Sequence, residues 1–263
     1  YNARDARAVW RSIRAAGKVT MGSLYHEAMA NGWRDNGAYE RPSHAQIEER
    51  KRLAADRETV EGQAREKAQQ AAAKKAGWIL HQCKPEKHAY LDSKGFRDDI
   101  GRVWLADESN NLLCVPMYVN EALVGVQLID RTGQKKFLTG QRTSGAVRLI
   151  NNDGYGADNW FCEGYATALS LRACLQKMSL RYKIYVCFSA TNMKNVAKSI
   201  ASGYVICDQD ESGTGERAAE EIGLPYWIPF DSTHDFNDWH KKNGSFKCSQ
   251  ELRKWLNFTK NSV

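Results

Sequence analysis

The spacing of apolar and polar positions changes along the chain and separates helix-forming from strand-forming sequence. Between residues 10 and 33, periodic apolar positions follow Thr20 and stop at Gly32, which predicts a small helical unit. The stretch from about 43 to 75 consists mainly of Glu, Arg, Lys, Ala and Gln, which all favour helix. Oppositely charged residues lie one turn apart there, so we expect one long exposed connecting helix. A helix that grips nucleic acid is the alternative.

Beyond Gly77 and Trp78, short apolar runs predict β-strands. Each run is rich in Val, Leu, Ile or aromatic residues, and turn-forming residues separate the runs, which lie at 112–119, 122–130 and 135–138. Because so few residues connect them, we expect these strands to form an antiparallel meander.

After residue 151, strands and helices alternate. Strands are expected at 159–162, 184–188, 204–207 and 226–229, and helices at 165–177, 192–202 and 215–222. Strands that alternate with helices of this length favour a parallel sheet with right-handed crossovers. The sequence therefore predicts an α/β fold, in which a parallel sheet flanked by helices follows a β-rich module.

We expect domain boundaries where these patterns change. The expected segments are a helical segment at 1–40, a long charged helix or linker at 41–77, a β-rich module at 78–150, an α/β domain at 151–243 and a C-terminal helix at 244–263. Because the sequence begins inside a helical unit, we interpret the first segment as the end of a larger domain and the chain as a piece of a longer polypeptide.

Composition and charge narrow the class of protein. Apolar residues make up 42% of the chain and charged residues 26%, proportions that exclude wholesale disorder. No stretch has the roughly 18 uncharged apolar residues of a membrane span, and the charged N-terminus is unlike a signal peptide, so we expect no membrane association. The formal charge of +7 favours a polyanionic partner.

The seven cysteines do not follow a disulfide or zinc pattern. None belongs to a C-x-x-C pair or to a Cys/His cluster, which excludes a zinc ribbon. Cys162, Cys187 and Cys207 lie in apolar runs, where a thiol packs as a small hydrophobic side chain. We therefore expect reduced, buried cysteines and a cytoplasmic protein.

Acidic residues follow two of the strands expected in the α/β domain. Glu163 comes directly after the first strand, and Asp208 and Asp210 follow the third. Ligands of open α/β sheets bind beyond the carboxyl ends of the strands, so these carboxylates would converge if the two strands are neighbours. Hard oxygen ligands without nearby Cys or His favour Mg²⁺ or Mn²⁺ over Zn²⁺. The alternative is that the acidic residues cap helices and that Gly164 serves only a tight backbone bend.

This arrangement resembles the Toprim domain of bacterial-type primases, type IA and II topoisomerases and some nucleases. The marks of that domain are a Glu-Gly after the first strand and an Asp-x-Asp after a later strand, which match Glu163-Gly164 and Asp208-Gln209-Asp210. Runs at 163–170, 188–197 and 235–240 resemble the Toprim primases of conjugative plasmids and phages.

The resemblance extends upstream of the acidic residues. Runs that resemble the polymerase-side module preceding Toprim in these primases lie at 88–95, 113–116, 126–130 and 133–138. The resemblance therefore implies that 78–150 is the N-terminal module of a primase core and 151–243 the Toprim domain. The segment 10–33 is similar to the end of a small helical domain of primase-helicases.

The implied function is that of a DNA primase, which joins nucleoside triphosphates into short RNA primers on single-stranded DNA. Glu163, Asp208 and Asp210 would be catalytic and would hold the metal. Asp235 and Asp238 would complete the metal shell, unless Asp235 only caps a helix. The cations expected to bind nucleotide and DNA are Lys94, Lys135, Lys136, Arg142 and Arg148.

Aromatic and histidine positions are less specific. Trp104, Tyr118 and Phe137 are candidates for stacking on the bases of single-stranded DNA, although core packing is the usual role of such residues in strands. His88 and His240 are expected to be structural, since the metal chemistry requires neither of them.

Two departures from the family pattern limit what the chain is expected to do alone. It contains neither a zinc-binding module for template choice nor the G-x-x-x-x-G-K-[ST] phosphate loop of a helicase. A helicase would therefore be supplied in trans or by a further part of the polypeptide. The alternative functions are a Toprim nuclease and a non-catalytic DNA-binding or partner-binding replication module.

Overall fold

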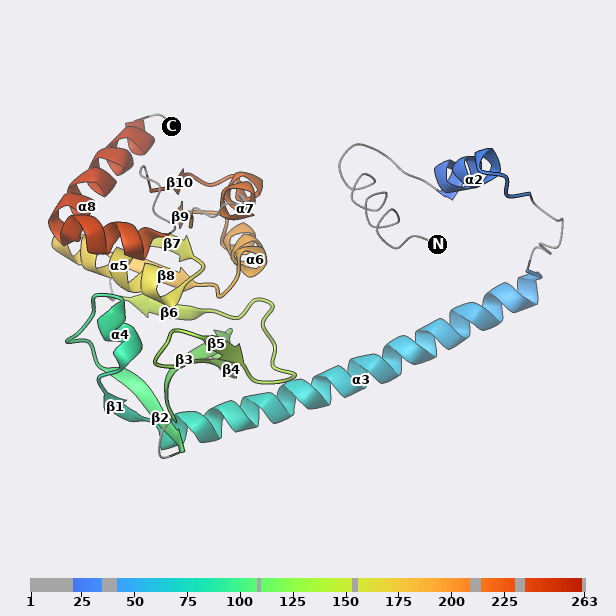
Figure 1. Cartoon of the computed structure of the whole chain (residues 1–263), viewed down its shortest axis with the longest axis horizontal. Coiled ribbons are helices and arrows are strands. Elements are labelled where there is room, and N and C mark those ends of the chain that lie inside the picture. The colour runs from blue at the N-terminus through green and yellow to red at the C-terminus, as the bar shows by residue number, and fades with distance from the viewer. Residues whose placement is uncertain are drawn as a thin grey trace. The chain divides into compact units, whose positions relative to one another are not determined.

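The structure, a computed structural model, describes residues 21–34, 42–107, 110–152, 156–208, 214–229 and 235–261. The chain divides into two compact units, Tyr1–Thr59 and Val60–Val263. The second unit contains two β-sheets and several helices, so the fold is mixed α/β (Figure 1). None of the helices in the described ranges is long and apolar enough to span a lipid bilayer.

The first described helix is α2, Met21–Ala30. It ends where Gly32 takes a φ of 90°, a left-handed conformation that glycine adopts without strain. Tyr25 packs edge-on against Trp33, with 5.1 Å between the ring centroids. The predicted helical unit is therefore found in this part of the chain, while residues 10–20 lie outside the described ranges.

The long helix α3 spans His44–Gln82. It begins with a capping box, in which the Gln46 amide donates to Ser43 Oγ at 3.2 Å and the Ser43 amide donates to Gln46 Oε1 at 2.8 Å. Ion pairs between residues one turn apart follow in the next turns. These local interactions explain why the charged sequence is helical, as predicted, although its first half is exposed.

The C-terminal end of α3 differs from the predicted end near residue 75. The helix continues through Gly77 to Gln82, so the expected boundary at residue 78 falls inside it. Ala72, Ala76 and Ile79 lie on one side of these last turns and are buried. Their packing against the first sheet stabilises the helix beyond the point where the sequence pattern changes and outweighs the low helix propensity of glycine.

The first sheet is an antiparallel meander with the strand order β1-β2-β3-β4-β5. Its strands are β1 Lys84–Glu86, β2 Gly101–Asp107, β3 Asn110–Val119, β4 Ala122–Ile129 and β5 Lys135–Phe137, with the short helix α4, Ala89–Ser93, between β1 and β2. The predicted meander is confirmed for β3, β4 and β5. The strands β1 and β2 and helix α4 were not predicted.

Alternating residues of β3 give the first sheet two buried faces. Cys114 packs on the face that α3 covers. Leu113 and Val115 point to the opposite face, where they share a hydrophobic cluster with Leu91 of α4 and with Leu169 of the following domain. The β-rich sheet is therefore fixed to the α/β domain through a common core.

The second sheet has the strand order β10-β9-β7-β8-β6. Its strands are β6 Arg148–Asn151, β7 Asp158–Cys162, β8 Tyr182–Val186, β9 Tyr204–Ile206 and β10 Tyr226–Trp227. The pairs formed by β7 to β10 are parallel, whereas β6 pairs antiparallel with β8. The prediction of a parallel sheet is therefore right for β7 to β10 and misses the antiparallel edge strand.

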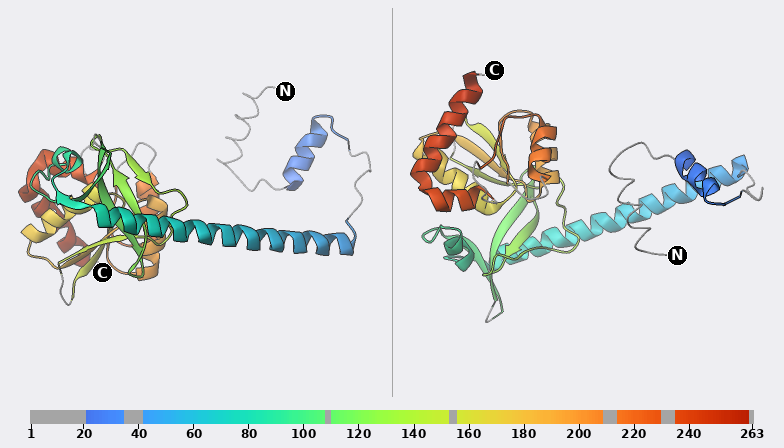
Figure 2. Two further views of the ribbon diagram at one scale, coloured as in Figure 1. Left: turned by 90° about the horizontal axis from the view of Figure 1, so that it is seen from below. Right: turned by 45° about the horizontal axis from the view of Figure 1, so that its top comes forward.

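Helices cover both faces of the second sheet. On one face α5, Tyr165–Lys177, packs beside α8, Phe236–Asn261, and on the other face α6, Ala190–Ile200, packs beside α7, Thr214–Ile222 (Figures 1 and 2). Helix α8 is kinked at Gly244, where φ is 75°. The C-terminal helix expected at 244–263 is therefore the second part of a helix that already begins at Phe236.

Backbone contacts join the two sheets next to the carboxyl edge of β8. Tyr118, at the end of β3, exchanges two hydrogen bonds of 2.9 Å with Val147, which directly precedes β6. The buried side chain of Asn192 accepts from the Gly145 amide at 2.7 Å and donates to the Cys187 carbonyl at 2.8 Å. These bonds hold the segment that enters β6 against the end of β8.

Candidate metal centre

The two strands that carry the predicted acidic residues are neighbours in the second sheet. Strands β7 and β9 pair in parallel, with Phe161 beside Val205. Glu163 follows the end of β7, and Asp208 follows the end of β9. Both residues therefore leave the sheet at the same carboxyl edge, which is the condition on which the predicted convergence depended.

Asp208 lies in an unfavourable environment for a charged carboxylate. Burial, together with the nearby carboxylates of Asp235 and Glu163, raises the pKa of Asp208 to about 7. A hydrogen bond from Thr167 Oγ1 to Asp208 Oδ1, 3.3 Å long, acts in the opposite direction, as does the positive charge of Lys135. Burial and these two neighbouring carboxylates therefore disfavour the charged form of Asp208 at this edge of the sheet.

Thr167 is a member of the site that the sequence analysis did not single out. Its side chain is 2% exposed, and it lies in the first turn of α5, close behind Glu163. The only signal in the sequence is its spacing from Glu163, which places both residues at the same end of the helix. Its contact with Asp208 depends on the pairing of β7 with β9 and is not visible in the local pattern.

Asp235 is a helix cap, the second of the two roles between which the sequence left a choice, and it also lies near enough to Asp208 to act on its charge. Its Oδ1 atom accepts a hydrogen bond of 2.7 Å from the Asp238 amide, so it caps α8. Its charge also raises the pKa values of Asp208 and of the buried Tyr90 hydroxyl. Asp238 lies in the first turn of α8 and contributes its backbone amide to this cap.

Asp210 lies outside the described residues, and the structure gives no position for it. Two described residues on either side of it, Asp208 and Gly215, lie close together. A Cβ atom on Gly215, in the first turn of α7, would lie 2.5 Å from the carbonyl oxygen of Asp208. The start of α7 therefore packs directly against the Asp208 backbone, and a side chain at position 215 would displace it.

The Glu163 segment is fixed by the strand beside it. The Cys187 amide donates to the Cys162 carbonyl, and the Phe188 amide donates to the Glu163 carbonyl, both at 2.9 Å. Gly164 is the N-cap of α5 with φ −97° and ψ 148°, an extended conformation. The chain bends at Glu163, directly before this cap, as β7 gives way to α5.

One of the five predicted cations, Lys135, acts on Asp208, and Lys94 is tied through its backbone to the start of α8. Lys135, the first residue of β5, is near enough to lower the pKa of Asp208. The Lys94 carbonyl accepts a hydrogen bond of 2.9 Å from the buried amide of Asn237, two residues after Asp235. Lys136 follows Lys135 in a strand, so its side chain points to the opposite face of β5.

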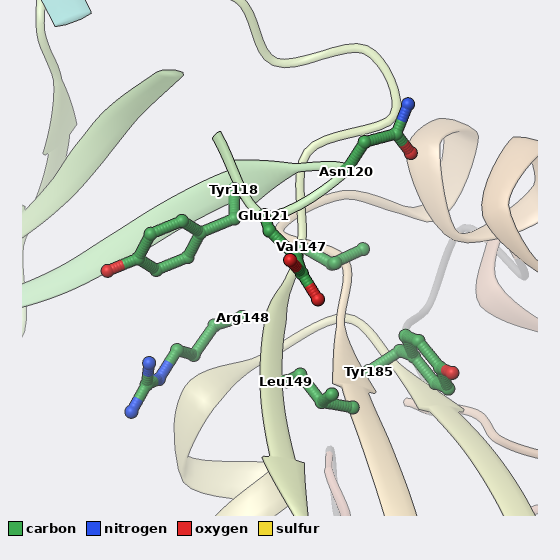
Figure 3. A pocket seen from close by; sticks show the side chains of 7 residues that line it. All are labelled: Tyr118, Asn120, Glu121, Val147, Arg148, Leu149 and Tyr185. Atoms are coloured by element: carbon green, nitrogen blue, oxygen red, sulfur yellow. The ribbon is translucent and has the colours of Figure 1, made fainter. Parts of the chain in front are cut away.

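The two predicted arginines line cavities elsewhere in the second unit. Arg148 begins β6 and acts electrostatically on Tyr165, the first residue of α5. It also lines a cavity of about 310 Å³ with Tyr118, Glu121 and Tyr185, and Figure 3 shows its guanidinium directed away from the Tyr185 ring. The Arg142 side chain donates to the Ser144 carbonyl at 3.1 Å and lines a neighbouring cavity beside α6.

Of the remaining aromatic and histidine candidates, three make structural contacts and one is exposed. Trp104 packs edge-on against Trp78 at 6.0 Å. His88 caps α4, because its Nδ1 atom accepts from the Tyr90 amide at 3.2 Å, and His240 Nε2 lies 2.8 Å from Ser245 Oγ. Both histidines thus make structural contacts, as expected. The Phe137 side chain, in contrast, is 43% exposed.

Within the described ranges, no three His, Cys, Asp or Glu side chains are gathered closely enough to form a ready-made metal site. The residues that are present nevertheless have the chemistry of a magnesium or manganese site. Glu163, Asp208 and Asp235 offer hard oxygen ligands, and a bound cation would offset the burial and the neighbouring negative charges that raise the pKa of Asp208.

Comparisons with known proteins do not identify a family for this chain, because no family model matches it and no curated protein matches it significantly.

Proposed function

We propose that the chain contains the catalytic core of a Toprim-type DNA primase, which makes short RNA primers on single-stranded DNA. The observation that carries the proposal is the convergence of Glu163 and Asp208 at the carboxyl edge of two neighbouring parallel strands, where burial, followed by the charges of Asp235 and Glu163, raises the pKa of Asp208. Carboxylates are crowded in this way at sites that bind divalent cations. The Glu-Gly and Asp-x-Asp motifs place these same residues in the Toprim pattern.

The ligands proposed for Mg²⁺ or Mn²⁺ are Glu163, Asp208 and Asp210, with Asp235 nearby. When bound, the metal neutralises the charge that develops on the phosphate oxygens during nucleotidyl transfer. The Thr167 hydroxyl orients the Asp208 carboxylate by donating to it. Lys135 supplies a positive charge at the same edge, where the phosphates of a nucleoside triphosphate would bind.

The reaction proposed for this site joins two nucleotides. The 3′-hydroxyl of one nucleotide attacks the α-phosphorus of a nucleoside triphosphate, and the hydroxyl proton passes to solvent. A new phosphodiester bond forms, the bond between the α-phosphorus and the bridging oxygen breaks, and pyrophosphate leaves. Single-stranded DNA is the template, and the chain's positive formal charge of +7 is compatible with this partner. A helicase, where one is needed, is proposed to act in trans or from a further part of the polypeptide.

An assay with three distinguishable outcomes tests this function. The full chain is incubated with single-stranded DNA, labelled ribonucleotides and Mg²⁺ or Mn²⁺, and the products are separated by length. We expect short labelled oligonucleotides from the wild type and none from Glu163→Gln or Asp208→Asn. Asp158→Asn is the control, because Asp158 begins β7 at the opposite edge of the sheet, where it pairs with Lys260 at 3.7 Å. Cleaved DNA would instead support a Toprim nuclease. The absence of both labelled oligonucleotides and cleaved DNA would support a non-catalytic binding module.

A further inference from the structure

Strand β5 directs two different side chains toward the acidic edge of the second sheet. Side chains alternate along a strand, so Lys135 and Phe137 share one face of β5 and Lys136 points to the other. The positive charge of Lys135 lowers the pKa of the Asp208 carboxyl. The Phe137 end contacts Phe188, which follows β8 at the carboxyl edge.

Phe188 links the aromatic contact to the backbone of the candidate metal centre. The two phenyl rings meet edge to face, with 6.3 Å between centroids and an interplanar angle of 82°. The Phe188 amide donates to the Glu163 carbonyl at 2.9 Å. The Phe137 ring therefore packs against a residue whose backbone is hydrogen-bonded to Glu163.

The backbone of Phe188 is strained, which indicates that its position is not chosen for stability alone. Its φ of 65° lies in the left-handed region, which bulky side chains rarely adopt. Such conformations persist where the surrounding structure enforces them, and they cluster at functional sites. Here the strained residue supports an exposed ring beside a group of carboxylates and a lysine.

We propose that Phe137, supported by Phe188, is a stacking platform for the base of a nucleoside triphosphate whose phosphates lie toward Lys135 and the carboxylates. This inference rests on the proposed metal centre and adds a subsite to it. Features on one face of β5 suit the parts of such a ligand: Phe137 is aromatic and 43% exposed, and Lys135, on the same face, carries a positive charge that reaches the Asp208 carboxylate. The platform makes the site selective for ligands that carry a base over those that carry phosphates alone.

Binding of two probes to the full chain tests the platform. The probes are ATP and inorganic tripolyphosphate, each titrated calorimetrically in the presence of Mg²⁺. Phe137→Ala should weaken ATP binding about tenfold, the usual scale of base stacking on an aromatic side chain, and leave tripolyphosphate binding unchanged. Lys135→Ala should weaken both probes, since it removes a charge that faces the phosphates. Phe137→Trp, which keeps an aromatic face, should retain ATP binding.

Matched controls exclude general effects of these substitutions. Phe258→Ala removes a phenylalanine that is 73% exposed on α8, and Lys183→Ala removes an exposed lysine from the amino-terminal part of β8. Neither should change the affinity for either probe. The platform would be overturned if Phe137→Ala lost ATP and tripolyphosphate affinity equally, or lost neither. It would also be overturned if the wild type bound ATP no more tightly than tripolyphosphate.

The platform and the proposed function fail in different ways. Primer synthesis by the wild type, together with normal ATP binding by Phe137→Ala, would overturn the platform and leave the primase proposal intact. ATP binding that depends on Phe137, in a wild type that makes no product, would support the platform and contradict the primase proposal.

Discussion

The carboxyl group of Asp208 couples the candidate metal centre to the stability of the fold. Its pKa is raised from 3.8 to about 7 in the folded chain by burial and by Asp235 and Glu163. The folded state therefore binds a proton more tightly than the unfolded state does. The stabilisation by this proton is present at low pH and is lost as the pH rises toward and through about 7.

Replacing Asp208 with Asn should therefore stabilise the metal-free protein at high pH. We expect the free energy of unfolding to rise by roughly 1 to 3 kcal/mol at pH 8, because the amide is never charged, and by clearly less at pH 5. Added Mg²⁺ should raise the melting temperature of the wild type and not that of Asp208→Asn. Thermal unfolding at the two pH values, with and without Mg²⁺, measures both effects. A variant that is less stable than the wild type at pH 8 would contradict the crowding of carboxylates.

Thr167 should set the affinity of the metal centre without binding the metal itself. Thr167→Val keeps the shape of this buried side chain but removes the donor to Asp208 Oδ1. We expect Mg²⁺ or Mn²⁺ affinity to fall by about tenfold, the lower end of the effect of losing a residue that orients a metal ligand. Thr167→Ser keeps the hydroxyl and should retain most of the affinity. If Val and Ser variants bind metal equally well, the hydrogen bond has no such role.

The sequence predicted Glu163 and Asp208 because each follows a strand directly, and strand ends can be read from local patterns. It did not predict Thr167, because its partner Asp208 is far away in the sequence and is brought close only by the pairing of β7 with β9. Asp235 could be interpreted from the sequence either as a cap or as a metal ligand; the structure shows the cap of α8 and a charge effect on Asp208, and the metal ligand stays a prediction.

At the scale of the elements, the entry into α7 positions Asp208. We expect Gly215→Ala to lower the free energy of unfolding by about 1 to 3 kcal/mol, because the added Cβ would lie 2.5 Å from the Asp208 carbonyl oxygen and the backbone must move. The same movement should weaken metal binding. Gly62→Ala is the control, since nothing lies within 4 Å of a Cβ at this position in α3, and alanine favours helix. Chemical unfolding of both variants measures the difference, and equal effects would contradict the close packing of α7 on Asp208.

Elements with strong local patterns were predictable, and those that depend on tertiary contacts were not. The strands and helices from β7 to β10 were expected within a few residues of their bounds, since each apolar run is followed by a helix-forming stretch. Strand β1 has only three residues, all exposed, and exists through its pairing with β2. Helix α3 extends past Gly77 because Ala72, Ala76 and Ile79 are buried against the first sheet.

At the scale of the whole molecule, the packed part of α3 belongs to the second unit. A chain truncated to begin at Val60 keeps Ala72, Ala76 and the contact between Ala68 and the loop at Gly140, whereas a chain that begins at Trp78 loses all three. We expect the chain that begins at Val60 to have a melting temperature close to that of the full chain. The chain that begins at Trp78 should melt several degrees lower, where each loss of roughly 1 kcal/mol of unfolding free energy lowers the melting temperature by a few degrees. Calorimetry of the three proteins measures this. Equal melting temperatures for the two truncated chains would contradict a structural role for the end of α3.

Titration of the full chain with Mn²⁺ tests the metal centre most directly, because it depends on neither a template nor a nucleotide. The wild type should bind Mn²⁺, and Glu163→Gln and Asp208→Asn should each lower the affinity by more than about tenfold while keeping a native circular dichroism spectrum. Asp158→Asn, at the opposite end of β7, should bind as the wild type does. Unchanged Mn²⁺ affinity in Glu163→Gln and Asp208→Asn would show that these carboxylates do not hold a metal, and the proposed catalytic site would be wrong.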